Sequence, residues 1–110
     1  MIKIIDNPDL VNIKKMANAI IIAYTNWSGY SLRNYSECIK LLNDRNYKGE
    51  IFQLNMNNVT EEFQLNTFNK LCEGWGEIFV IEQGKITESF FGRDCLNEFR
   101  IRTENNSLLK

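Results

Sequence analysis

Residues 20–31 read IIIAYTNWSGYS, and this stretch decides the fold. Its first half shows no alternation of apolar and polar residues and is rich in isoleucine. Such a run is typical of a strand that is buried on both faces at the centre of a sheet. The corner WSGYS, residues 27–31, follows at once. We therefore predict a central strand over 19–25 that leads through this corner to the start of a helix.

The segment after the corner predicts a long amphipathic helix over 30–46. Its apolar residues recur at i, i+3, i+4 and i+7, namely Tyr35, Cys38, Ile39 and Leu42, and this is the spacing of one helix face. Ser28 or Ser31 can accept hydrogen bonds from the free amides at the start of this helix, because serine is a favoured N-cap residue. The sequence therefore predicts a structural role for these serines.

The rest of the chain alternates further strands with helices. Short β-type runs lie at 2–5, 51–54, 77–82 and 85–91. Helical spacing occurs at 10–17, from Thr60 to Cys72 and from Asp94 to Ile101, with N-caps expected at Asn7, Thr60 and Asp94. Residues 105–110 are expected to form a frayed tail.

The element order is therefore βαβαβαββα, and the last two strands are joined as a hairpin by the turn at Gln83-Gly84. Strands that are joined through helices are expected to run parallel to one another, and the hairpin is expected to be antiparallel. The predicted fold class is α/β, with a mixed central sheet and helices on both faces.

The composition narrows the class of protein. At 110 residues, with 44% hydrophobic and 25% charged residues, the chain is expected to fold as one globular domain over 1–110. The net charge of -1 gives no basic surface for nucleic acid. The longest apolar run, 19–24, is too short to span a bilayer, and no secretory signal is visible. We therefore expect a cytoplasmic protein whose partner is neither nucleic acid nor a membrane.

The chain has no histidine and three cysteines. Without histidine, Ser-His or Cys-His activation of a nucleophile and His-type metal sites are excluded. Cys38, Cys72 and Cys95 are odd in number and far apart, which argues against a disulfide framework and against a CxxC zinc or redox motif. Each is predicted on an apolar helix face, as a small buried hydrophobe, with Cys72 the most open to exposure. We expect no catalytic residue, no metal and no cofactor.

Two motifs resemble those of thioredoxin-fold proteins, and the resemblance covers nearly the whole chain. WSGYS sits where thioredoxins carry WCGPC, after the central strand and at the head of a long helix. The segment GWGEIFVIEQGKITESFFG, residues 74–92, is similar to the C-terminal hairpin of that family. The resemblance implies a single thioredoxin-like domain.

The departures from the family pattern decide the expected activity. Ser28 and Ser31 occupy both cysteine positions, and a serine hydroxyl cannot exchange with a disulfide. Tyr30 replaces the proline between the cysteines, Ile22 falls at the buried acid of the family, and Gly76 falls at the cis-proline that presents backbone to a bound peptide. The resemblance therefore implies a redox-inactive member of the family that is not an enzyme.

The same resemblance brings the corner 27–31, the loop before the hairpin and the turn at Gly92-Arg93 onto one surface. The implied protein-binding residues are Trp27, Ser28, Tyr30, Ser31, Trp75, Gly76 and Arg93. Aromatic residues and arginine are the side chains that most often anchor protein interfaces. The alternative is that one or both tryptophans cover the core, since tryptophan is usually largely buried.

Our first hypothesis is a non-catalytic binding domain whose partner is another protein. A bacterial immunity protein that neutralises a cognate toxin domain fits this class, because such proteins are often small, acidic, single-domain and free of catalytic groups. One alternative within the same fold is an assembly chaperone. The other is a divergent thiol-disulfide oxidoreductase that works through Cys72 or another cysteine.

Overall fold

The computed structural model describes residues 2–105. Five strands form one sheet in the order β1-β3-β2-β4-β5. The strands are β1 (Ile2–Ile5), β2 (Asn18–Tyr24), β3 (Glu50–Asn55), β4 (Ile78–Glu82) and β5 (Lys85–Phe90). The α-helices in this range are α1 (Gly29–Asp44), α2 (Glu61–Phe68) and α3 (Cys95–Asn105). The tail expected at 105–110 lies outside the described residues, apart from Asn105, which ends α3.

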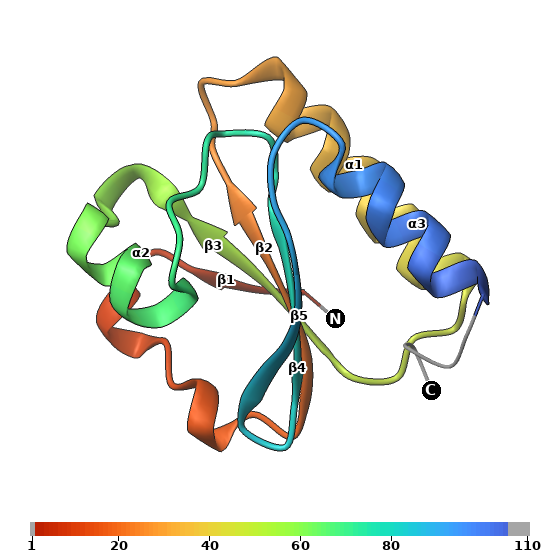
Figure 1. The fold of residues 1–110 in the computed structure, drawn as a ribbon, viewed down its shortest axis with the longest axis horizontal. Coiled ribbons are helices and arrows are strands. Elements are labelled where there is room, and N and C mark those ends of the chain that lie inside the picture. The colour runs from red at the N-terminus through yellow and green to blue at the C-terminus, as the bar shows by residue number, and fades with distance from the viewer. Residues whose placement is uncertain (1, 106–110) are drawn as a thin grey trace.

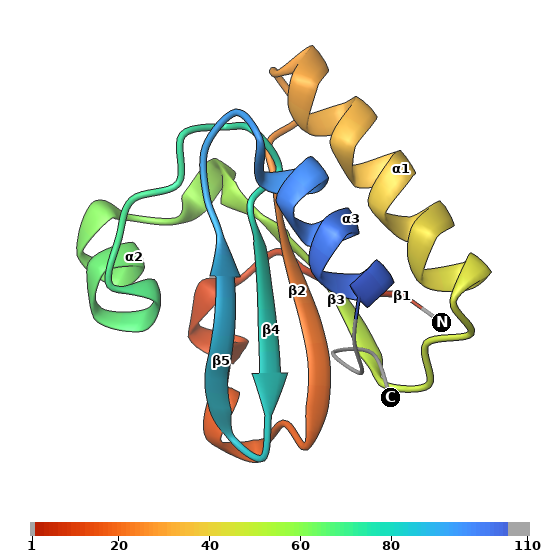
Figure 2. The ribbon, with the colours of Figure 1, turned by 45° about the vertical axis from the view of Figure 1, so that its right-hand side comes forward.

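The helices cover both faces of the sheet, as predicted. Helices α1 and α3 lie side by side on one face, whereas α2 and the short 3-10 turns after β1 lie on the other (Figure 1). Figure 2 shows the same layers turned, with β5 at one edge and β1 at the opposite edge. None of the helices within residues 2–105 is long and apolar enough to cross a membrane.

Strand β2 is the central strand that the isoleucine-rich run predicts. Residues 19–23 are each at most 1% exposed. Ile20 and Ile22 pack against α1 and α3, while Ile21 belongs to the apolar cluster on the side of α2. Because β2 is buried on both faces, its sequence has no polar face, which explains the missing alternation.

The direction of β4 differs from the prediction. β4 runs antiparallel to β2, whereas β3 runs parallel to it. β3 ends at Asn55, which pairs with Tyr24 at the carboxyl end of β2, and β4 begins at Ile78, which pairs with Ile22 near the same end. Residues 69–77 therefore return the chain from α2 to the end of the sheet at which β3 finished, and β4 starts from that same end. The rule for helix-linked strands fails here because this connection is not a crossover.

The single helix predicted over 10–17 is also wrong. This part of the chain forms two 3-10 turns, Pro8–Leu10 and Ile13–Lys15. The backbone at Met16 is extended, and its carbonyl accepts a hydrogen bond of 2.8 Å from the N–H of Gly84 in the hairpin turn. Pairing with the hairpin therefore replaces the helical bonds that the local spacing suggested.

The helix predicted as far as Cys72 ends at Phe68. Asn69 follows it in the left-handed conformation, with φ 63, and closes the last turn; asparagine tolerates this conformation better than most residues. The N-cap predicted at the other end is confirmed, since the Thr60 hydroxyl accepts the N–H of Phe63 at 3.0 Å. Cys72 therefore lies in the loop that precedes β4.

Candidate functional site

The two serine hydroxyl groups of the WSGYS corner are both used inside the structure. The Ser28 hydroxyl accepts the N–H of Ser31 at 3.3 Å, which confirms its predicted role as N-cap of α1. It also donates to the carbonyl of Gly74 at 2.9 Å and so ties the corner to the loop before β4. The Ser31 side chain is buried, and its hydroxyl accepts the N–H of Thr25 at 2.9 Å. Both hydroxyls hold the corner in place.

The aromatic side chains beside this corner are largely open to solvent. Trp27 is 75% exposed and Tyr30 is 56% exposed. Trp27 lies over Gly74, where an added Cβ would come within 3.2 Å of the indole ring. The ring centroids of Tyr30 and Trp75 are 4.8 Å apart. We call Trp27, Tyr30 and Trp75 the aromatic surface, because the corner and the loop before β4 bring these three residues together.

The two tryptophans have different environments. Trp75 is half-buried and packs against the apolar cluster under α1 and α3, so the alternative of a core-covering tryptophan applies to Trp75 and not to Trp27. Arg33 lies over the ring of Tyr30, with its guanidinium 5.7 Å from the ring centroid. Arg93 is exposed at the nearby turn. Sequence reasoning missed Arg33, because its position on α1 resembles an ordinary solvated helix face.

The backbone of Trp75 is engaged on both sides. Its carbonyl accepts a hydrogen bond of 2.7 Å from the side-chain amide of Asn34 on α1, and its N–H donates to the carboxylate of Glu77 at 3.2 Å. In the family pattern, the position of Gly76 is held by a cis-proline that presents backbone to a bound peptide. Gly76 is instead buried with φ 83, a value that the ring of proline cannot adopt.

Glu77 is the residue of this region that the sequence analysis overlooked. It is fully buried, and its carboxylate accepts the N–H groups of Glu73 at 2.9 Å, Trp75 at 3.2 Å and Gly92 at 3.4 Å. Its own carbonyl accepts the N–H of Ala23 on β2 at 2.8 Å. The chain thus has a buried acid beside the central strand, although it does not lie at Ile22, where the family pattern would place it.

The cysteines lie outside the corner 27–31, although the Cys95 thiol donates weakly to the carbonyls of Trp75 at 3.6 Å and Gly76 at 3.7 Å. All three thiols are weakly acidic. Cys38 and Cys95 are fully buried, while Cys72 is partly buried. Burial, followed by the carboxylate of Glu77, raises the pKa of Cys95 to about 12. The same two causes raise the pKa of Cys72, and burial followed by Cys95 raises the pKa of Cys38. Among the described residues, no three acidic, cysteine or histidine side chains are grouped as metal ligands would be.

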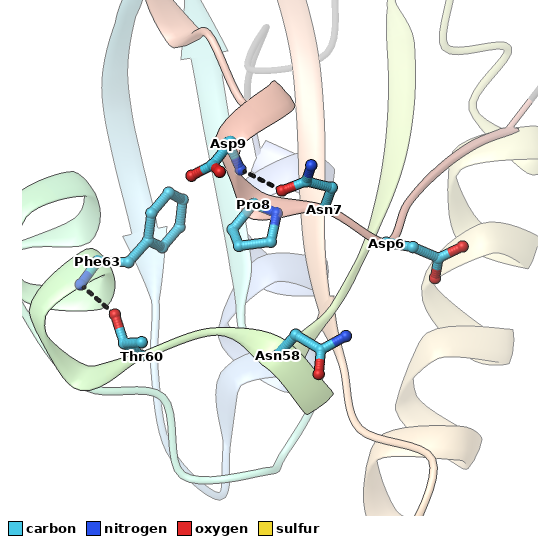
Figure 3. A pocket seen from close by; sticks show the side chains of 7 residues that line it. All are labelled: Asp6, Asn7, Pro8, Asp9, Asn58, Thr60 and Phe63. Carbon is cyan, nitrogen blue, oxygen red and sulfur yellow. Dashed lines mark hydrogen bonds between the residues drawn. The ribbon is translucent and has the colours of Figure 1, made fainter.

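A separate cavity of about 380 Å³ lies on the side of α2 (Figure 3). Its lining residues are Asp6, Asn7, Pro8, Asp9, Asn58, Thr60 and Phe63. The amide oxygen of Asn7 accepts the N–H of Asp9 at 3.0 Å, which confirms the N-cap predicted at Asn7. Figure 3 shows the carboxylates of Asp6 and Asp9 on opposite sides of Pro8, so these two groups do not converge on one ligand.

Comparison with known proteins identifies the fold. No protein-family model matches the chain, and no curated protein matches its sequence. Thioredoxin f2 of Chlamydomonas reinhardtii has a TM-score of 0.69 at 14% identity, covering 96% of this chain and 97% of that one. A putative oxidoreductase with a thioredoxin fold has 0.74 at 13%, covering 94% of each. Arabidopsis thaliana thioredoxin O2 has 0.68 at 12%, covering 94% and 93%. The chain has a thioredoxin-like fold.

The thioredoxin-like fold confirms the fold class and the family resemblance that the order of elements and the two motifs predicted. At this level of identity the likeness concerns the fold alone. For the site, the fold shows only which segments of the chain lie close together. Within this thioredoxin-like domain, the corner with Ser28, the loop with Trp75 and the turn with Gly92 are joined by the hydrogen bonds described above.

Gly76→Ala tests the backbone at the centre of this site. A side chain at φ 83 is strained, and its Cβ would approach the Cβ of Asn34 to 3.3 Å. We expect the free energy of unfolding to fall by about 1–2 kcal/mol, measured by urea unfolding. Gly29→Ala is the matched control, because nothing lies within 4 Å of its added Cβ. Equal stability of the two variants would contradict the strained geometry.

Proposed function

We propose that this thioredoxin-like domain is non-catalytic and binds another protein through the aromatic surface. One observation carries the proposal: Trp27, 75% exposed, and Tyr30, 56% exposed, lie in a corner whose two serine hydroxyls are occupied in internal hydrogen bonds. Large aromatic side chains are costly to leave in water and are the usual anchors of protein interfaces. Ser28, Ser31 and Gly76 support this surface, and the exposed Arg93, which follows Gly92 in the chain, is included as a further binding residue.

The partner that we favour is a toxin domain, with the chain acting as a bacterial immunity protein in the cytoplasm. Neutralising a toxin requires tight binding and no chemistry of its own. A small domain whose exposed aromatic residues flank a serine that is hydrogen-bonded to a helix start and a loop suits that task. An assembly chaperone would use the same surface, and the identity of the bound partner separates the two.

The oxidoreductase alternative has less support. It requires a thiolate that can attack a disulfide, whereas burial raises the pKa of all three thiols. Cys72, the most exposed of them, lies in the loop before β4 and not at the start of a helix. Reduction of a disulfide substrate that disappears in Cys72→Ser would nevertheless favour this alternative over protein binding.

Partner capture tests the proposed function. The whole chain, immobilised, is used to isolate its partner from extracts of the organism that encodes it, and the dissociation constant of the purified pair is then measured. Because an aromatic anchor contributes about 2 kcal/mol or more, Trp27→Ala is expected to weaken binding about 30-fold or more. The matched control is Leu10→Ala, which removes a side chain that is 72% exposed in the turn on the other face of the sheet.

Either of two outcomes would contradict this function. One is a partner that binds wild type and Trp27→Ala equally well. The other is a partner whose binding is weakened by Leu10→Ala and not by Trp27→Ala, since the interface would then lie on the side of α2.

A further inference from the structure

Glu77 is a buried carboxylate whose hydrogen-bond partners are all backbone amides. Its side chain is fully buried, and among residues 2–105 no lysine or arginine forms an ion pair with it. Burying a charged group is unfavourable unless hydrogen bonds replace its water. The amides of Glu73, Trp75 and Gly92 provide this replacement. Because burying a carboxylate is unfavourable, we expect Glu77 to have a role other than filling space in the core.

The three amides come from two separate segments. Glu73 and Trp75 precede β4, whereas Gly92 follows β5. One carboxylate oxygen, Oε2, accepts from both Glu73 and Gly92, while Oε1 accepts from Trp75. The carboxylate therefore joins the loop that carries the indole of Trp75 to the turn that precedes Arg93.

These two segments have little stiffness of their own. Gly74, Gly76 and Gly92 adopt φ values of 85, 83 and 81, which glycine reaches readily but which leaves the unfolded chain very free. The family's proline is absent from this loop. A side chain that binds three amides at once supplies the missing restraint.

The same contacts affect what the loop can bind. An extended peptide that adds to a backbone segment needs a free N–H and a free carbonyl on that segment. At Trp75 the N–H is bound by Glu77 and the carbonyl by Asn34, with distances of 3.2 and 2.7 Å. The Cys95 thiol also contacts this carbonyl, with the sulfur 3.6 Å from the oxygen. A peptide could pair there only by displacing these internal hydrogen bonds. The side chains of Trp27 and Tyr30, in contrast, are free to be contacted.

Resting on the proposed function, we propose that Glu77 is the positioning residue of the aromatic surface. It fixes the Trp75 loop and the Gly92 turn in one arrangement and, with Asn34, closes the Trp75 backbone to strand pairing. The surface therefore binds the side chains of a folded protein and not an extended peptide.

Amide hydrogen exchange of the free, whole chain tests the positioning role by NMR. In wild type the amides of Glu73, Trp75 and Gly92 should be protected. Glu77→Gln keeps the volume but turns one acceptor oxygen into a donor, so exchange should rise about tenfold or more at the amides that this oxygen binds, either Trp75 or the pair Glu73 and Gly92, while the amides of β2 are unchanged. General destabilisation would raise all rates together. Glu82→Gln, at the exposed end of the same strand, is the matched control.

Peptide titration tests the binding mode. A mixture of short random-sequence peptides is added to the labelled chain, and the Trp75 amide signal is followed. Wild type should give no shift, whereas the double variant Asn34→Ala with Glu77→Gln should shift at this amide. A peptide-induced shift of the Trp75 amide in wild type would overturn the proposal, as would unprotected Glu73, Trp75 and Gly92 amides. The amide protection and the peptide titration of wild type test the proposal even if a variant fails to fold.

Failure of the proposed function gives a different pattern. A partner that binds Trp27→Ala as well as wild type removes the aromatic surface as the interface, while the exchange rates still report whether Glu77 holds the two segments. If the three amides are protected but the partner binds only as an unfolded chain, the positioning role of Glu77 stands and the inference that the surface binds a folded protein is wrong.

Discussion

The thiols of the folded protein are expected to react with a chromogenic disulfide about 1000-fold more slowly than free cysteine at about pH 8. At that pH a thiol with an ordinary pKa near 9 is about one-tenth ionised, whereas a thiol whose pKa is raised to about 12, as at Cys95, is ionised to about one part in ten thousand. Cys38 and Cys72 are shifted in the same direction by burial. Stopped-flow absorbance measures the rate.

The control is the same reaction in denaturant, where all three cysteines should react at the rate of free cysteine. A single fast thiol in the folded protein that is lost in Cys72→Ser would contradict the expectation and support the oxidoreductase alternative. The fast thiol would then have to be located relative to the Trp75 loop, because Cys72 lies three residues before Trp75 in the chain.

The same shifts give stability a pH dependence with a definite sign. The folded-state pKa of Cys95 is raised, so the folded state keeps its proton where the unfolded state releases it. This contribution to the free energy of unfolding is fully present below the unfolded pKa near 9 and is lost as the pH rises through about 12. Urea unfolding at increasing alkaline pH should show stability falling, and Cys95→Ala should reduce the slope.

Phe79→Ala is expected to lower the free energy of unfolding by about 3–5 kcal/mol. Phe79 is fully buried in the cluster between the sheet and α2, stacked on Phe68 with ring centroids 3.9 Å apart and edge-on to Phe91 at 5.3 Å. Removing the ring leaves a cavity beside the rings of Phe68, at the end of α2, and Phe91, just after β5. Such a loss is a large part of the total stability of a domain this size.

Urea unfolding followed by circular dichroism measures this loss. Phe63→Ala is the matched control, because Phe63 is only partly buried at the edge of the same cluster, edge-on to Phe68 at 6.1 Å. Its effect should be smaller than that of Phe79→Ala. A Phe79→Ala protein within about 1 kcal/mol of wild type would show that the core on the side of α2 contributes little to folding.

The sequence pattern was sufficient to predict those elements whose contacts in the fold favour the same conformation as the local sequence does. The unbroken apolar run gave β2 because burial on both faces removes any need for polar residues. The spacing of Cys38 and Leu42 gave α1 because its buried side needs only a helical repeat. Distant contacts decided the rest: the carbonyl of Met16 binds the hairpin turn instead of a helical amide, and the loop 69–77 reverses β4.

The candidate site divides in the same way. The cap at Ser28 was predictable, because capping depends on residues adjacent in sequence. The roles of Glu77 and Asn34 were not, since their hydrogen bonds reach Gly92 and Trp75, fifteen and forty-one positions away. In sequence, a glutamate before an apolar strand looks like a solvated residue. Only the folded chain places three amides around it.

The hydrogen bond from Ser28 to Gly74 bears on whether a dithiol could be introduced at this corner in single steps. A single change of Ser28 to cysteine would exchange a good O–H donor, 2.9 Å from its acceptor, for a weak S–H donor with a larger atom. It would gain no second thiol, because Ser31 is buried and committed to the Thr25 amide. Introducing a dithiol at this corner would therefore pass through an intermediate that has lost a structural hydrogen bond before the second thiol is present.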